Sequence, residues 1–515
     1  MLKNIVVFGP AHAGKSTLVG YLIAKLMMSD KQVNDIFEDI KMLMGSEYDE
    51  TESYAYLVDK HKDERFFHLK PSSGDHGHSL YMHFEQLNIG NKKIHIIDTP
   101  GAEHRSRDRQ KGLFYGDIGL FMIDVADLSE SLLESQKWER VKRFLLPLFS
   151  SRDFTKGNKR LVVILSKMDT REYSSALFNA AKKRVYQLLG DNTIDVIPIA
   201  IDVLNRNDNN VISVSEKMPW FKDKTLFERL SGIIESKEYV EPASMLLPVG
   251  RVYDKKWLGL IAEGKLLSGY VKKQQQVKIL PVFIQNKSYG VLYATTGSLR
   301  MSKGDDIDEA TPGDIISVRL QDLRINDRRC EKSDIEIIES TTIVEYNTRI
   351  AYGRILKFQI NDRNPLQLNV LDNIRILWFG KQLSSRIIYF NIDNEQSYIN
   401  LEVDNGPVAI PLQCGIEGEL LCHDFLLLTQ SDRIVQGRLI MISEPTSITF
   451  KIKDEWDSLN YFKGFNSEKI GDRMTLRCAD SGKEMLVIVR RFLQRHGEDP
   501  ESENNIHINT EEVYM

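Results

Sequence analysis

A glycine-rich loop near the amino terminus constrains the fold of this chain more than any other feature. Residues 9–17, G-P-A-H-A-G-K-S-T, fit the phosphate-binding pattern G-x-x-x-x-G-K-[ST] and directly follow the apolar run 5–8. Apolar residues then recur at helical spacing from Leu18 to Met27. The sequence therefore predicts a strand, a loop and a helix that bind phosphate; the alternative is a glycine-rich turn without a ligand.

Each part of this loop has a predicted role at a nucleoside triphosphate. Glycines let successive backbone N–H groups point inward at the anion, and the helix that follows presents its positive end. Lys15 is expected to reach the β and γ phosphates, and Ser16 to offer its hydroxyl to Mg²⁺. The predicted nucleotide contacts are Gly9, His12, Ala13, Gly14, Lys15, Ser16 and Thr17.

A second motif lies at residues 94–101, I-H-I-I-D-T-P-G. An apolar strand that ends in Asp98 can hold a carboxylate near the metal, so Ser16 and Asp98 are the predicted Mg²⁺ residues. Gly101 lets a backbone N–H approach the γ phosphate. The tetrapeptide D-T-P-G at residues 98–101 is by itself typical of an ordinary turn. Here it stands at the spacing expected from the phosphate loop.

A third motif, S-K-M-D at residues 166–169, follows the apolar run 161–165 and matches the guanine-selecting pattern N-K-x-D. Asp169 is predicted to accept hydrogen bonds from N1 and N2 of guanine, and the Lys167 stem to lie against the base or sugar. Ser166 replaces the usual asparagine. A hydroxyl can still bridge to the phosphate loop but makes fewer hydrogen bonds, so weaker nucleotide affinity or relaxed base choice is expected.

With these motifs the chain resembles the translational GTPases of the elongation factor 1-alpha and elongation factor Tu family. Residues 53–65 are similar to the segment that leads into the first switch of that family, and 218–222, M-P-W-F-K, to a segment near the end of its GTPase domain. Residues 247–253, L-P-V-G-R-V-Y, resemble the start of its second domain. The resemblance covers roughly residues 1–442 and thins after Thr341.

The resemblance implies an α/β P-loop GTPase domain followed by two β-barrel domains, with a small C-terminal extension. The predicted boundaries are 1–238 for the GTP-binding domain, 239–338 and 339–443 for the barrels, and 444–515 for the extension with an acidic flexible tail. It also implies a further guanine contact, through a backbone N–H at Ala200. The polar residues 205–210 predict a surface loop without function.

The first switch departs from the family pattern. Where the family has R-G-I-T, whose threonine completes the Mg²⁺ shell, residues 67–70 are F-H-L-K. Lys70 cannot bind Mg²⁺, so either Ser72 or Ser73 substitutes, or the switch closes differently with Lys70 on phosphate. His76, His78 and His83 give either a metal site or, more simply, a solvated loop.

The second switch departs at the catalytic position. The family carries histidine directly after D-x-P-G, and here that residue is Ala102, which cannot orient a water molecule. His104, two residues further on, is the candidate catalytic residue; the alternative is a solvated histidine. Because phosphoryl transfer depends mostly on positioning and charge, the loss of this group is predicted to slow hydrolysis without abolishing nucleotide binding.

Composition sets the broad class. The 515 residues carry a net charge of −5, which disfavours nonspecific coating of nucleic acid but allows local RNA contacts. Arg105, Arg107, Arg109 and Lys111 form either a solvated face or an RNA site. No cleavable leader is expected, no apolar run reaches about 18 residues, and the four cysteines lack C-x-x-C spacing. A cytoplasmic monomer with reduced thiols and no membrane contact is expected.

Three functions remain open at this point. The first is a Mg²⁺-dependent GTPase that acts in translation through nucleotide-dependent domain rearrangement, with GTP and GDP as ligands and the ribosome, tRNA and an exchange factor as partners. The second is a GTPase that regulates a non-ribosomal assembly, as in the sulfate-activation branch of the family. The third is a nucleotide-gated binding protein with little hydrolysis, which Ala102 and Lys70 favour.

Overall fold

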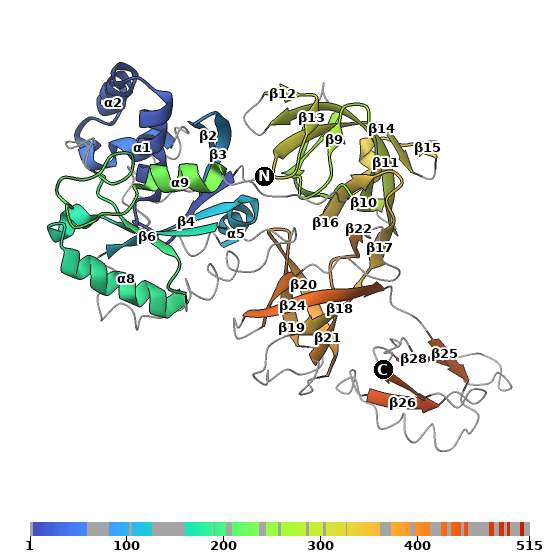
Figure 1. Ribbon diagram of the computed structural model, residues 1–515. Helices are drawn as coiled ribbons and strands as arrows, with labels where there is room; N and C mark the ends of the chain where they lie inside the picture. The colour runs from blue at the N-terminus through green and yellow to red at the C-terminus, as the bar shows by residue number, and fades with distance from the viewer. Residues whose placement is uncertain are drawn as a thin grey trace.

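The structure, drawn in Figure 1, is a computed structural model. The residues that it describes are 4–58, 82–101, 106–125, 160–189, 191–201, 209–235, 244–255, 259–284, 288–301, 305–325, 327–360, 372–391, 397–411, 424–429, 434–443, 448–451, 473–477, 484–488, 492–494 and 505–508. All statements below concern these residues.

The first unit is an α/β domain built on a six-stranded sheet. In spatial order the strands are β2 (His83–Ile89), β3 (Lys92–Asp98), β1 (Asn4–Phe8), β4 (Ile118–Asp124), β5 (Arg160–Ser166) and β6 (Asp195–Pro198). All neighbours pair in parallel except β2 and β3, which form an antiparallel hairpin. Since helices cover a parallel sheet, β1 is buried along its whole length, as its apolar sequence predicts.

Helices surround this sheet in Figure 1 and contribute to its core. They start where the sequence supplies caps: Ser29 and Gln32 form a reciprocal capping box at the start of α2, and Thr225 and Glu228 do the same at α9. The helices are α1 (Lys15–Met27), α2 (Asp30–Met44), α3 (Ser53–Val58), α5 (Ser106–Tyr115), α8 (Ser175–Leu189) and α9 (Leu226–Glu235), with short 3₁₀ turns η1 (Gly45–Glu47), η2 (Glu50–Glu52) and η6 (Met168–Arg171).

The second unit is a β-barrel. Its sheet runs β12-β11-β10-β16-β7-β8-β14-β15, and an additional pairing of β11 with β14 closes the ring. The strands are β7 (Leu247–Lys255), β8 (Gly259–Lys265), β9 (Val271–Lys272), β10 (Gln276–Ile284), β11 (Ser288–Met301), β12 (Asp306–Ile307), β13 (Glu309–Ala310), β14 (Ile315–Ile325), β15 (Arg328–Arg329) and β16 (Ile335–Glu345), with the 3₁₀ turn η7 (Lys332–Asp334) before β16.

The third unit is a closed barrel in the order β18-β21-β20-β19-β23-β24, beside the pair β17-β22. The predicted boundary after residue 338 falls inside β16, which pairs with β10 and β7 of the second unit up to Glu345. The strands are β17 (Ile350–Gly353), β18 (Ile355–Ile360), β19 (Asn373–Trp378), β20 (Lys381–Asn391), β21 (Ser397–Val403), β22 (Val408–Pro411), β23 (Asp424–Leu428) and β24 (Ile434–Ser443).

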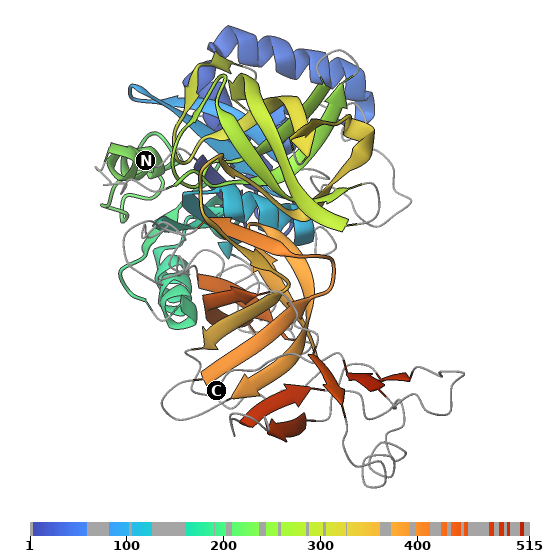
Figure 2. The ribbon, with the colours of Figure 1, turned by 90° about the vertical axis from the view of Figure 1, so that its right-hand side faces the viewer.

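Short strands follow the third barrel and lie beyond it in both views (Figure 2). They are β25 (Ile448–Lys451), β26 (Arg473–Arg477), β27 (Glu484–Ile488), β28 (Phe492–Gln494) and β29 (Asn505–Ile508). β25 pairs with β29, and β26 with β27. These strands lie in the predicted extension, and β29 stands in the region where a flexible tail was expected.

Helix α5 joins the first unit to both barrels. The Lys111 ammonium donates to the Gly250 carbonyl of β7 at 3.2 Å, and the Gln382 amide of β20 donates to Gln110 at 2.9 Å. Arg109 is buried. The prediction that Arg109 and Lys111 belong to a solvated face or an RNA site is therefore wrong, because these side chains are used inside the molecule.

The described residues also bear on the expectations about membrane-spanning helices and cysteines. None of the described helices combines the length and the apolar composition that a membrane crossing requires. Cys330 is a free, partly buried thiol; Cys414, Cys422 and Cys478 lie outside the described residues.

Candidate nucleotide-binding site

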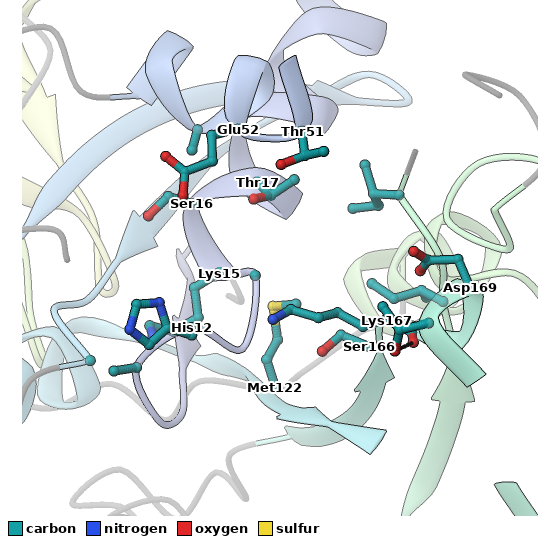
Figure 3. A pocket seen from close by; sticks show the side chains of 17 residues that line it. His12, Lys15, Ser16, Thr17, Thr51, Glu52, Met122, Ser166, Lys167 and Asp169 are labelled. Atoms are coloured by element: carbon teal, nitrogen blue, oxygen red, sulfur yellow. Dashed lines mark hydrogen bonds between the residues drawn. The ribbon is translucent and has the colours of Figure 1, made fainter. Parts of the chain in front are cut away.

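A cavity of about 390 Å³ opens at the carboxyl ends of β1, β4 and β5, a volume in the range of small-molecule sites. This edge is where parallel α/β sheets bind ligands. Figure 3 shows the phosphate loop on one side of the cavity and the segment after β5 on the other. The predicted residues that line it are His12, Gly14, Lys15, Ser16, Thr17, Gly101, Ser166, Lys167 and Asp169.

Backbone conformation explains the glycines of the phosphate loop. Gly14 has φ 82° and stands directly before α1, so it turns the chain into the helix in a left-handed conformation. A Cβ at Gly9, φ 146°, would lie 2.1 Å from the Met122 carbonyl oxygen, so only glycine lets the loop leave β1 beside β4. His12 has φ 63°, a conformation that histidine adopts more readily than most residues.

Lys15 lies at the floor of the loop. Its ammonium donates to the Pro10 carbonyl at 2.7 Å, and the residue as a whole is 6% exposed. Burial lowers the pKa of Lys15 to about 8, against the opposing effect of the Asp98 carboxylate. A polyphosphate in this cavity would favour the charged ammonium, which is the role predicted for this residue.

Ser16 and Asp98 meet beside the helix start. The Ser16 hydroxyl donates to Asp98 Oδ2 at 2.6 Å, although 82 residues separate them in the chain. Asp98 is held at the end of β3 because the next residue, Thr99, donates its N–H and its hydroxyl to the Val7 carbonyl of β1. A hydroxyl and a carboxylate are oxygen ligands of the kind that Mg²⁺ prefers, so this pair fits the metal.

Gly101 comes very close to the phosphate loop. A Cβ at this position would lie 2.7 Å from Ala11 Cα and 2.6 Å from Lys15 Nζ, so a larger residue would push the two loops apart. Its carbonyl accepts from Arg109 of α5 at 3.4 Å. The loop after β3 therefore connects the phosphate side of the cavity to the helix that contacts both barrels.

At the other end of the cavity, Ser166 ties two loops together. Its hydroxyl lies 2.8 Å from the Ala13 carbonyl and 3.1 Å from the Ile123 carbonyl, which gives the predicted bridge to the phosphate loop. Lys167 has φ 59°, and its ammonium pairs with Asp124 at 3.1 Å. Asp169 is the second residue of the turn η6 and lines the cavity.

The segment after β6 differs from its prediction in two ways. The Ala200 N–H donates to the Asn209 carbonyl at 3.3 Å, and the cavity is lined by its neighbours Ile199 and Ile201 instead. Asn209 and Asn210 are buried, not on a surface loop. The Asn210 carboxamide accepts from a backbone N–H at 2.8 Å and donates to a carbonyl at 3.3 Å, so burial of its polar atoms is compensated.

Several predicted residues lie outside the described part of the chain. They include the candidate catalytic residue His104, Ala102 beside it, and Lys70, Ser72, Ser73, His76 and His78 of the first switch. His83 is described and lies in β2, opposite Asp98 of β3. Among the described residues, no three His, Cys, Asp or Glu side chains gather as a metal site would require.

Besides Thr170, which directly follows S-K-M-D, and the two neighbours of Ala200 named above, the motifs missed four residues that line the cavity: Thr51, Glu52, Ala55 and Met122. Met122 belongs to β4, whose apolar sequence gives no functional signal. The other three lie in η2 and α3, within or just before the segment that resembles the approach to the first switch. That resemblance was the available signal for their position.

The sheet, the phosphate loop and the two barrels define a P-loop nucleotide-binding protein with translation-factor architecture. The family model for the elongation factor Tu GTP binding domain matches residues 1–283, and the chain belongs to this family. Membership implies binding of guanine nucleotides, and a translation-factor-like GTPase as the class of protein.

Known relatives agree with this assignment. Elongation factor 1-alpha of Plasmodium falciparum is 26% identical over 332 residues, which cover 63% of this chain and 67% of the relative. Elongation factor 1-alpha of Tetrahymena pyriformis is 27% identical over 333 residues, 63% of this chain and 69% of the relative.

Solved structures share the fold. The Ski7 GTPase-like domain of S. cerevisiae, bound to GTP, is 15% identical with a TM-score of 0.66 and covers 86% of this chain and 97% of that domain. Elongation factor SelB of Methanococcus maripaludis, with the GTP analogue GPPNHP, is 13% identical with a TM-score of 0.53, covering 100% and 99%.

Proposed function

We propose that this chain binds GTP and GDP with Mg²⁺ in the cavity between residues 9–17 and 166–169 and hydrolyses GTP slowly. One observation carries the proposal: the Ser16 hydroxyl bonds to Asp98 at 2.6 Å on the phosphate side of a cavity whose far wall holds Asp169. A phosphate-and-metal end and a carboxylate at the base end are what a guanine nucleotide needs.

At the phosphate end, the loop N–H groups and Lys15 bind the phosphates, and the Gly101 N–H reports on the γ phosphate. Ser16 and Asp98 would hold Mg²⁺, which neutralises charge on the β and γ oxygens when bound. Support comes from the 2.7 Å and 2.6 Å distances that an added Cβ at Gly101 would have to Ala11 and Lys15. A loop this close senses the occupant of the phosphate site directly.

At the base end, the Asp169 carboxylate accepts from N1 and N2 of guanine, and the Lys167 stem lies along the base. The Lys167 ammonium is paired with Asp124 at 3.1 Å, which holds the stem in one orientation. Adenine offers no N1–H and no N2 donor group, so it leaves the carboxylate unsatisfied. The Ser166 bridge suits a site with moderate affinity.

Hydrolysis is proposed to be slow because Ala102 follows Gly101 where a water-orienting side chain is needed. His104 is proposed to supply that group when the loop closes. The second candidate function, a nucleotide-gated binding protein without turnover, is favoured by the same alanine.

The proposed work of the nucleotide is a change in domain arrangement in translation, with the ribosome, tRNA and an exchange factor as partners of a cytoplasmic monomer. Consecutive residues of α5 support this route: Arg109 contacts the Gly101 loop, Gln110 the third unit and Lys111 the second. A shift of that loop would therefore reach both barrels.

The experiment is hydrolysis of labelled GTP and ATP by purified protein, with and without ribosomes, using Lys15→Ala as the blank. GTP-selective turnover that depends on Lys15 and rises with ribosomes supports the proposal. Nucleotide binding without turnover under any condition supports the gated binder. Stimulation by a non-ribosomal partner enzyme alone supports the regulatory alternative.

A further inference from the structure

The turn η2 sits at the wall of the cavity and is fixed by its own side chains. The Asp49 carboxylate accepts from the N–H and the hydroxyl of Thr51 at 2.9 and 2.7 Å, which caps the turn. The Ser53 hydroxyl donates to the Glu50 carbonyl at 2.7 Å. Glu52, the last residue of the turn, is therefore held by hydrogen bonds on both sides of it.

Packing of α3 on α1 fixes the position of this turn relative to the phosphate loop. A Cβ at Gly20 of α1 would lie 1.8 Å from the Tyr54 carbonyl oxygen, so the two helices touch through their backbones. The Tyr54 ring is buried between Tyr21 and Phe37, with edge-to-face geometry and centroids 5.3 and 5.4 Å away. The position of Glu52 is thus set by the core.

The Glu52 side chain extends from this turn toward Ser16, the residue that bonds Asp98 (Figure 3). Both Glu52 and Ser16 line the cavity, and Glu52 is half-buried. The Tyr56 hydroxyl donates to Glu52 Oε2 at 3.2 Å, which orients the carboxylate and occupies one of its lone pairs. A carboxylate has about four such acceptor positions, so it can make further contacts.

The negative charge of Glu52 at this location favours the binding of a cation. A carboxylate beside a polyphosphate repels it unless a cation lies between them, and hard divalent cations bind carboxylate and phosphate oxygens together. Mg²⁺ sites of this kind need only one or two carboxylates, with phosphate and water as the other ligands. Ser16, Asp98 and Glu52 together meet that requirement.

We infer that Glu52 is a third side chain of the Mg²⁺ shell, acting on the metal directly or through a metal-bound water. This inference rests on the proposed function. It answers the question left by Lys70 in the first switch, because the missing threonine oxygen is replaced by a carboxylate from the preceding turn. Since η2 is held by packing and not by a γ phosphate, Glu52 serves the metal with GDP as well as with GTP.

The test is release of fluorescent GDP from the full chain, measured at a series of free Mg²⁺ concentrations and in EDTA. Loss of an outer contact to a bound metal typically weakens metal binding about 10- to 100-fold. Glu52→Gln is therefore expected to raise the Mg²⁺ concentration for half-maximal slowing of GDP release by about that factor. Its release rate in EDTA is expected to equal that of the wild type.

Two matched variants separate a metal role from a structural one. Glu50→Gln removes an exposed carboxylate from the same turn and is expected to leave the Mg²⁺ midpoint unchanged. Tyr56→Phe removes the hydroxyl that orients Glu52 but keeps its carboxylate, so a smaller shift is expected.

The outcomes distinguish this inference from the function on which it rests. GDP binding with the same Mg²⁺ midpoint in Glu52→Gln and wild type overturns the inference alone. Faster GDP release from Glu52→Gln in EDTA also overturns it, since the residue would then shape the pocket without the metal. No GDP binding by the wild type overturns the proposed function itself.

Discussion

The ammonium of Lys265 lies 2.6 Å from the carboxylate of Asp117, and this buried ion pair joins the second unit to the first. The other Asp117 oxygen accepts from the N–H and the side-chain amide of Asn4 at 2.9 Å each. The Asn4 amide also donates to the Gly313 carbonyl at 2.7 Å. Both Asp117 oxygens and the donors of Asn4 and Lys265 are paired across this contact, so the two units dock in one defined way.

Lys265→Ala should destabilise the protein strongly, by about 3 to 5 kcal/mol, because it leaves the Asp117 carboxylate buried without its cation. The matched control is Lys272→Ala, which removes an exposed partner of Glu309 and should cost less than about 1 kcal/mol. Urea unfolding of both variants measures the difference. Equal losses for the two variants would contradict a structural role for the buried pair.

Gly20→Ala should force α3 away from α1, because the new methyl group would lie 1.8 Å from a carbonyl oxygen. A loss of about 1 to 3 kcal/mol in the free energy of unfolding is expected, together with weaker GDP binding. Gly232→Ala in α9 is the control: nothing lies within 4 Å of its added Cβ, and alanine should stabilise the helix by about 0.5 to 1 kcal/mol. Chemical denaturation should give opposite signs; the same sign for both would refute the packing argument.

The buried ammonium of Lys15 predicts a pH dependence of stability without nucleotide. Its pKa is about 8 in the folded protein and 10.5 when unfolded, so between these values the unfolded chain binds more protons. The contribution of Lys15 to the free energy of unfolding therefore rises with pH in that window, by up to about 1.4 kcal/mol per pH unit. Below pH 8 this contribution is constant.

The measurement is the difference in free energy of unfolding between wild type and Lys15→Met from pH 7 to 10. Lys111 and Lys381 also have pKa values lowered to about 8, but both variants contain them and their effects cancel. The variant should be the more stable protein at pH 7, and its advantage should shrink above pH 8. An advantage that stays constant to pH 10 would contradict the lowered pKa.

The architecture could be predicted because local signals and a family resemblance agreed. The loop at residues 9–17, flanked by an apolar run and a helical period, admits few folds, and the segment 247–253 indicated the first barrel. The boundary predicted after residue 338 falls inside β16, and only the pairing of this strand with β10 and β7 assigns its last residues to the second unit.

The candidate site was predictable where a motif fixes the chemistry and not where packing does. Ser16 and Asp98 came from motifs, and they meet at 2.6 Å. Glu52 belongs to no motif, since its place follows from the contact of two helices at Gly20. Asn210 was predicted to lie on a surface loop, but its side chain is buried. Its hydrogen-bond partners, the Pro198 carbonyl and the Ser215 N–H, are brought to it by the fold and are not marked in the sequence.

The central claim is that a guanine base binds against Asp169, and exchanging the base tests it most directly. Xanthine carries a carbonyl where guanine carries its amino group, and an asparagine amide can donate to that oxygen. Binding of GDP and xanthosine diphosphate to wild type and Asp169→Asn, measured by calorimetry with Mg²⁺, gives four affinities. We predict that the wild type prefers GDP and that the variant loses about 100-fold in GDP affinity while gaining xanthosine diphosphate. GDP binding that Asp169→Asn leaves unchanged, or no GDP binding by the wild type, would contradict the account.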